Sequence, residues 1–179
     1  MVEEIQLDNI NSNLPLFILM VGSQGQGKTT YANKIRIKRG SSVTSPNVYS
    51  YDDIEVELRE NSNGKFVYCN EILSHITNEI VTDLTNGVDA VYDNLNILGN
   101  SPLKVEESIP RNMYNYVGVV FNKPVEECLE NNKHKSKPLP EKCVRSMCNH
   151  NHTPVIGKFN HIVTVTHNTD YDEHIFIIN

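Results

Sequence analysis

The chain has 179 residues, of which 39% are hydrophobic and 21% are charged, with a net charge of −6 and an isoelectric point near 5.6. This length is enough for one hydrophobic core, so we expect a single domain over residues 1–179 that begins with a polar tail, residues 1–13. The negative charge argues against binding nucleic acid over a wide basic surface, so any such contact should be local.

The sequence gives no sign of secretion or membrane insertion. No apolar run reaches the roughly 18 residues that a membrane span requires. The first residues, MVEEIQLDNINSNLP, are acidic and polar, unlike a signal peptide. Four cysteines without a paired CxxC spacing are typical of reduced thiols. We therefore expect a cytoplasmic protein with no membrane partner.

The most informative segment begins with Leu16 to Val21, which is apolar at every position and predicts a central strand of a parallel sheet. The next eight residues, GSQGQGKT, match the P-loop pattern GxxxxGK[ST]. Glycines let backbone N–H groups point at phosphate oxygens, Lys28 would reach the β- and γ-phosphates, and the Thr29 hydroxyl would hold Mg²⁺. The pattern predicts ATP and Mg²⁺ as cofactors, with these nucleotide-binding residues: Gly22, Ser23, Gln24, Gly25, Gln26, Gly27, Lys28, Thr29 and Thr30.

The rest of the chain alternates between helical and strand patterns. The expected helices cover residues 30–39, 70–84, 102–113 with an interruption at Pro110, a segment from Pro124, and 141–148. The expected strands cover residues 48–51, 88–92, 116–121, 161–166 and 175–178, and residues 40–46 and 133–140 read as loops. This alternation predicts an α/β fold, a P-loop NTPase three-layer sandwich with a central, mostly parallel sheet.

Three aspartates follow expected strands, where a parallel sheet places its ligand site. Asp52 and Asp53 follow one strand and Asp93 ends the next. Each could act on the substrate or the metal, or could cap a helix. We favour proton acceptance for Asp52, a cap for Asp53, and a metal-binding role beside Thr29 for Asp93.

A basic segment lies between two expected helices. Lys133, His134, Lys135 and Lys137 are concentrated in "NNKHKSKPLPEK" of an otherwise acidic chain. Such a loop can close over phosphates as a lid, or it can be a solvated surface loop.

The order of these segments resembles the P-loop kinase family that contains the phage-type 5′-polynucleotide kinase domain, with AAA-like and zeta-type kinases among its relatives. The resemblance runs from about Leu16 to Met147 and rests on the P-loop, "YSYDDI", "AVYDNLNI" and "VVFNKPVEECLENNKHKSKPLPEKCVRSM". It implies that Asp52 is the general base for a 5′-hydroxyl and that Asp93 and Asn96 form the DxxN-like segment beside the site. It also implies that Val144 to Met147 belong to the helix after the lid.

The chain departs from this family at two places. The lid of the family carries arginines in an RNxxR pattern, whereas Glu130 to Lys135 contain none, so Lys135 or His134 is the hypothetical substitute. The family also places an arginine three residues after the catalytic aspartate, where this chain has Glu55, which would repel a nucleic-acid phosphate.

One further cluster, Cys143, Cys148, His150 and His152, has ligands that suit zinc but lacks a second pair at zinc-finger spacing, so we do not expect a metal there. The sequence predicts a kinase that transfers the γ-phosphate of ATP to the 5′-hydroxyl of a polynucleotide, with Lys28, Asp52 and Lys135 as catalytic residues. The alternatives are a kinase of a small-molecule hydroxyl acceptor, such as a nucleoside, nucleotide or other alcohol, and a nucleotide-binding module with little transfer.

Overall fold

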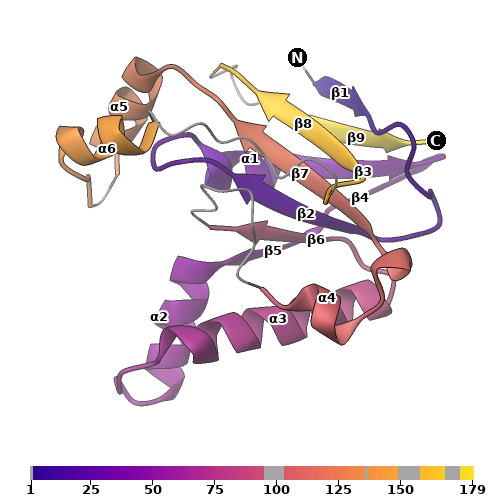
Figure 1. Ribbon diagram of the computed structural model, residues 1–179, viewed down its shortest axis with the longest axis horizontal. Coiled ribbons are helices and arrows are strands. Elements are labelled where there is room, and N and C mark those ends of the chain that lie inside the picture. The colour runs from indigo at the N-terminus through magenta and orange to yellow at the C-terminus, as the bar shows by residue number, and fades with distance from the viewer. Residues whose placement is uncertain (1, 95–102, 136, 149–157, 168–173) are drawn as a thin grey trace.

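The computed structural model describes residues 2–94, 103–135, 137–148, 158–167 and 174–179 (Figure 1). Its centre is a five-stranded sheet in which every neighbouring pair is parallel. The strand order is β5 (Asn47–Ser50), β6 (Ala90–Asp93), β2 (Leu16–Val21), β7 (Asn115–Phe121) and β8 (His161–Val165). The central, mostly parallel sheet expected of a P-loop α/β fold is confirmed.

Helices cover one face of this sheet. The bounds are α2 (Tyr51–Asn61), α3 (Cys69–Thr85), α4 (Val105–Ser108) and a short 3-10 turn (Arg111–Met113). Ile72, Ile76 and Ile80 of α3 are buried against Phe17 and Leu19 of β2. The helix expected over residues 70–84 is therefore confirmed, and its apolar stripe packs on the sheet.

The opposite face is covered by α1 (Lys28–Lys34) and by a second, four-stranded sheet, which lies behind the central one in Figure 1. The order of the second sheet is β1 (Glu3–Gln6), β9 (His174–Ile178), β3 (Ile35–Arg39) and β4 (Ser42–Thr44). Leu16, Ile18 and Met20 alternate with Phe17 and Leu19 along β2 and pack toward this layer. Because both faces of β2 are covered, the strand is buried at all six positions.

The second sheet corrects three expectations. The helix expected over residues 30–39 ends at Lys34, and Ile35–Arg39 forms a strand that pairs in parallel with β9. Ile35 and Ile37 are buried whereas Arg36 and Lys38 are partly exposed, so the period is two, and β-branched isoleucines favour it. The expected loop over residues 40–46 contains β4, and the expected polar tail contains β1, which pairs with β9.

The remaining differences concern helices. α2 was not among the helices expected from apolar periodicity, although the cap expected at Asp53 implied a helix here; its sequence, YDDIEVELREN, is mostly charged and buries no residue fully. The helix expected over residues 102–113 is reduced to α4 and the 3-10 turn, with Pro110 between them. After β7 come α5 (Val125–Lys133), which begins after Pro124 as expected, and α6 (Glu141–Cys148).

Two further points bear on the site. No helix in the described ranges is both long enough and apolar enough to cross a bilayer. Asn96, His150 and His152 lie outside the described residues.

Candidate functional site

The P-loop is shaped by two glycines in the left-handed backbone region. Gly25 has φ +84° and Gly27 has φ +82°, a conformation that side chains with a Cβ rarely adopt. A Cβ on Gly25 would also lie 2.4 Å from the carbonyl oxygen of Cys128 in α5. Asn131, one turn further along α5, donates a hydrogen bond from Nδ2 to the Gly25 carbonyl at 2.8 Å. The loop conformation is therefore tied to the position of α5.

Two predicted P-loop residues, Ser23 and Gln26, brace the loop from the side away from the cavity. The Lys123 backbone N–H donates to Gln26 Oε1 at 3.0 Å, and Gln26 Nε2 donates to Ser23 Oγ at 3.4 Å. Ser23 Oγ also lies 3.3 Å from the Cys148 sulfur. The backbone carbonyl of Ser23 accepts a hydrogen bond from Lys28 Nζ at 2.8 Å. Ser23 and Gln26 are buried and, like Gly22, do not line the cavity described next.

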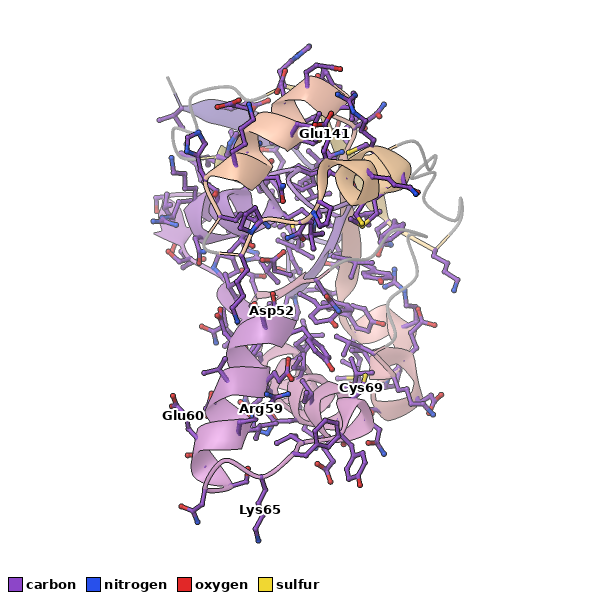
Figure 2. The ribbon with its side chains drawn as sticks, turned by 90° about the vertical axis from the view of Figure 1, so that its left-hand side faces the viewer. Asp52, Arg59, Glu60, Lys65, Cys69 and Glu141 are labelled. Atoms are coloured by element: carbon purple, nitrogen blue, oxygen red, sulfur yellow. The ribbon has the colours of Figure 1, made fainter. Side chains whose placement is uncertain are left out.

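A cavity of about 480 Å³ lies beyond the carboxyl ends of β5, β6 and β2. Figure 2 shows Asp52 at the end of α2 that is nearer to Glu141 of α6, with Glu60 and Lys65 at the opposite end of the α2 region. The cavity is lined by Gln24, Gly25, Gly27, Lys28, Thr29, Thr30, Ser50, Tyr51, Asp52, Asp93, Asn94, Asn131, His134 and Lys135. The structure therefore brings the predicted P-loop, both favoured aspartates and Lys135 to one place.

Lys28 and Asp93 form the buried polar centre of the cavity. Burial lowers the pKa of Lys28 to about 8, an effect that Asp93 opposes and Lys135 reinforces. Burial also raises the pKa of Asp93, against the hydrogen bond from Thr29 and the positive charge of Lys28, while Asp52 adds to the rise. Both groups are thus destabilised as isolated charges, and a bound anion and cation would stabilise them together.

The donors needed for a nucleotide and Mg²⁺ are present. The turn through Gly25 and Gly27 leads into α1, which begins at Lys28, so the loop, the start of the helix and the Lys28 side chain line one cavity, where a phosphate would meet backbone N–H groups and an ammonium. The Thr29 hydroxyl lies close enough to the Asp93 carboxylate to oppose the rise of its pKa. A hydroxyl beside a carboxylate is an oxygen pair that suits Mg²⁺. The residues therefore fit both ATP phosphates and the metal.

At the start of α2, the two adjacent aspartates, Asp52 and Asp53, differ in their relation to the cavity. Ser50 is the N-cap, and its hydroxyl accepts from the Asp53 backbone N–H at 3.5 Å. Neither aspartate is the cap, so the cap expected at Asp53 is wrong. Both side chains are exposed, but only Asp52 lines the cavity.

The basic loop, Lys133 to Pro140, contributes two side chains to the cavity, His134 and Lys135. Glu130 binds Lys133 Nζ at 2.7 Å and lies 3.2 Å from His134 Nε2. Within the described ranges no ion pair involves Lys135, which lies close enough to Lys28 to lower its pKa. Of the two proposed substitutes for the lid arginine, His134 lies beside Glu130, whereas no carboxylate among the described side chains forms an ion pair with Lys135.

Sequence reasoning missed four lining residues. Ser50 and Tyr51 precede Asp52 directly, and Asn94 follows Asp93, so adjacency to a predicted residue was a usable signal. Asn94 Nδ2 donates to the Tyr92 hydroxyl at 2.8 Å. Asn131 carried no such signal, because its contact with the P-loop joins positions 106 residues apart.

Among the side chains that the structure describes, no group of three His, Cys, Asp or Glu could hold a metal ion. The absence of zinc at the Cys143, Cys148, His150 and His152 cluster stays a prediction. Cys143 is exposed on α6, and Cys148 is partly buried beside Ser23. His150 and His152 are outside the described ranges.

No protein-family model and no curated protein matches this chain. Solved structures do match. A kinase candidate from Chloroflexus aurantiacus has a TM-score of 0.57 at 15% identity, with 87% of each chain covered. An unliganded sugar kinase from Janibacter sp. HTCC2649 has a TM-score of 0.50 at 12% identity, with 85% of each chain covered. A chain of the Pnkp1/Rnl/Hen1 RNA repair complex has a TM-score of 0.52 at 16% identity.

The match to the RNA repair complex covers 80% of this chain but only 45% of that chain, so this protein spans less than half the length of the chain it matches. At these identities the likeness shows the fold. The chain has the α/β fold of the P-loop kinases, in agreement with the cavity built around its P-loop.

Proposed function

We propose that the protein is an ATP-dependent kinase that transfers the γ-phosphoryl group to a hydroxyl. The observation that carries this proposal is the placement of the P-loop lysine, the Thr29–Asp93 pair and Asp52 around one cavity. A P-loop alone indicates nucleotide binding, whereas a further carboxylate in the same cavity, Asp52, supplies a base for an acceptor.

Each residue has a role that its position supports. The loop amides and Lys28 would hold the phosphates, and Thr29 and Asp93 would hold Mg²⁺, which neutralises phosphate charge when bound. Asp52 would accept the proton of the acceptor hydroxyl as its oxygen bonds to the γ-phosphorus. The bond from that phosphorus to the β,γ-bridging oxygen breaks, and ADP leaves. Lys135 would stabilise the charge on the transferring group.

The first candidate acceptor is the 5′-hydroxyl of a polynucleotide. It is supported by the order of the four segments that resemble the 5′-polynucleotide kinase family and by the fold shared with a chain of an RNA repair complex. Asp52, an exposed carboxylate that lines the cavity, is the kind of base that such a reaction needs.

A small neutral or cationic alcohol is the second candidate, because α2 is acidic where an acceptor would approach. Asp52, Asp53, Glu55 and Glu57 lie in its first two turns. Arg59 is held by Glu55 at 2.6 Å, so the one arginine of this helix is already paired. Carboxylates repel the phosphates of a nucleic acid but not an uncharged alcohol.

The test is transfer from γ-labelled ATP with Mg²⁺ to three sets of acceptors: DNA and RNA oligonucleotides with 5′-hydroxyls, nucleosides, and sugars or amino sugars. Labelled oligonucleotides support the first candidate, and label confined to small alcohols supports the second. Nucleotide binding without transfer to any acceptor would contradict the kinase proposal and indicate a nucleotide-binding module.

Asp52→Asn should reduce kcat by about a hundredfold or more while leaving the Kd for Mg-ATP nearly unchanged, because the amide cannot accept the proton. Asp53→Asn is the matched control, since it removes the same charge one residue away from the cavity, and it should retain the rate. Equal rates in the two variants would show that Asp52 is not the base.

A further inference from the structure

A buried asparagine near the end of α5 is bonded to the far end of the basic loop. Asn132 is 5% exposed. Its Nδ2 donates a hydrogen bond to the Leu139 backbone carbonyl at 2.8 Å, and its Oδ1 accepts one from the Leu139 backbone N–H at 3.1 Å. The amide nitrogen and the amide oxygen of one side chain therefore clamp the loop that joins α5 to α6, two helices that lie side by side (Figure 1).

The same residue also fixes the near end of the loop. The Asn132 backbone carbonyl accepts a hydrogen bond from the Lys135 N–H at 3.2 Å. Lys135 lines the cavity together with Lys28 and Asp93. Asn132 does not line the cavity, so any effect that it has on the reaction must pass through the residues that it holds.

We propose that Asn132 is a positioning residue for phosphoryl transfer, whose side-chain amide clamps Leu139 and thereby holds Lys135 at the transferring phosphate. The inference rests on the proposed function, in which Lys135 stabilises the charge on that group. With both ends of the loop bonded to one residue, the backbone that carries Lys135 has few conformations left to adopt.

A lid that uses lysine needs such a clamp more than a lid that uses arginine. A guanidinium can align itself on a phosphate through two parallel hydrogen bonds, whereas an ammonium is a point charge on a flexible stem. The position of the lysine charge therefore depends on the backbone below it. Electrostatic stabilisation requires that the charge is already in place when the phosphoryl group moves. Loss of the clamp should therefore lower the rate of transfer more than the affinity for nucleotide.

The first test is a double-mutant cycle, measured by transfer from γ-labelled ATP to an acceptor that accepts the label from the native protein. Lys135→Met should lower kcat by about a hundredfold. Asn132→Ala should lower kcat by about tenfold, because the lysine is misplaced but present, and should leave the Kd for Mg-ATP nearly unchanged. The double variant should be no slower than Lys135→Met, since Asn132 acts through Lys135. A double variant that is slower by the full product of the two effects would overturn the proposal.

Asn115 provides the matched control, because it makes the same kind of clamp far from the cavity. It is 3% exposed at the start of β7, and its Oδ1 accepts from the Asn11 N–H at 3.1 Å while its Nδ2 donates to the Asn11 carbonyl at 2.8 Å. Asn115→Ala should lower the urea midpoint as Asn132→Ala does, but it should retain kcat. Equal losses of kcat in the two variants would show that Asn132→Ala acts by general destabilisation and would overturn the proposal.

Limited proteolysis with trypsin follows the loop without any need for kinase activity. Asn132→Ala should be cut after Lys133 or Lys135 about tenfold faster than the native protein or Asn115→Ala, because the loop opens more often. Cutting at the native rate would overturn the clamp. Faster cutting in a protein whose native form transfers phosphate to no acceptor would instead contradict the proposed function.

Leu139→Pro tests the clamp from its other end, should Asn132→Ala not fold. Proline removes the backbone N–H that Asn132 accepts from, and it suits this exposed position because Leu139 precedes Pro140 and is already restricted to extended conformations. Trypsin cutting should be faster and kcat lower than in the native protein, both by less than in Asn132→Ala, since the bond to the carbonyl remains. No change in either measurement would overturn the proposal.

Discussion

Lys28 is the residue whose ionisation should control nucleotide affinity. Its pKa is lowered to about 8, chiefly by burial, so the free protein loses this positive charge as the pH rises through that value. Phosphates favour the protonated form, so binding above this pH must take up a proton. We expect the affinity for Mg-ATP to fall between about pH 7 and about pH 9, by up to about tenfold per pH unit above the pKa.

Calorimetry over this range measures the effect, and at the alkaline end the binding enthalpy should depend on the ionisation enthalpy of the buffer. Lys28→Arg supplies the control, because a guanidinium stays charged throughout this pH range. The affinity of this variant for Mg-ATP should therefore not change with pH. A flat profile for the native protein would mean that Lys28 does not contact the phosphates.

The packing of α5 against the P-loop makes Gly25 the most sensitive glycine of the described chain. Gly25→Ala combines a positive φ with a Cβ placed 2.4 Å from the Cys128 carbonyl oxygen, so α5 must move. We expect the free energy of unfolding to fall by about 3 kcal/mol, from backbone strain and overpacking together. Nucleotide binding should also weaken.

Gly87→Ala provides the matched control, because Gly87 has φ +76° but no heavy atom within 4 Å of an added Cβ. The control should lose only about 1 kcal/mol, from strain alone. Urea unfolding of both variants gives the comparison, and equal losses would show that contact with α5 is unimportant.

Helices and strands with a local sequence signal could be predicted, whereas those that depend on distant partners could not. β2 and α3 were predicted because a continuous apolar run and a helical apolar stripe are local signals. Ile35–Arg39 was assigned to a helix because its partner, β9, lies far along the chain and only the assembled sheet supplies its hydrogen bonds. α2 was missed because its acidic sequence carries little apolar periodicity, although Ser50 is a good N-cap.

The residues of the candidate site likewise could be predicted where they carry a local sequence signal and could not where tertiary packing places them. The P-loop, Asp52 and Asp93 could be predicted, since each lies in or directly after a recognisable strand. Asn131 could not, because its place beside Gly25 depends on the packing of a later helix. The N-cap expected at Asp53 was wrong because Ser50, two positions before Asp52, caps α2 and already accepts the free N–H of Asp53 itself.

At the scale of the whole molecule, the Arg39–Asp89 ion pair links the two sheets. Arg39 of β3 binds Asp89, just before β6, with both nitrogens at 2.6 and 2.7 Å, and Asp89 also accepts from the Leu16 N–H at 2.7 Å. Asp89 is 6% exposed. Arg39→Met would leave this buried carboxylate without its cation, and we expect a loss of about 2 kcal/mol or more in the free energy of unfolding.

Arg59→Met is the comparison, because Arg59 also pairs with a carboxylate at 2.6 Å but on the exposed surface of α2. Its loss should be below about 1 kcal/mol. Chemical denaturation measures the free energy of unfolding of both variants. Similar decreases in the two would mean that the Arg39–Asp89 pair does not stabilise the junction between the sheets.

β9 lies between β1 and β3, although these two strands are made early and β9 comes near the end of the described chain. During synthesis, the edges of β1 and β3 that pair with β9 therefore lack this partner while more than a hundred residues are added to the nascent protein. We expect limited proteolysis of ribosome-stalled chains to cut β1 and β3 readily until β9 has emerged. Protection that appears before β9 is available would show that another partner covers these edges in the meantime.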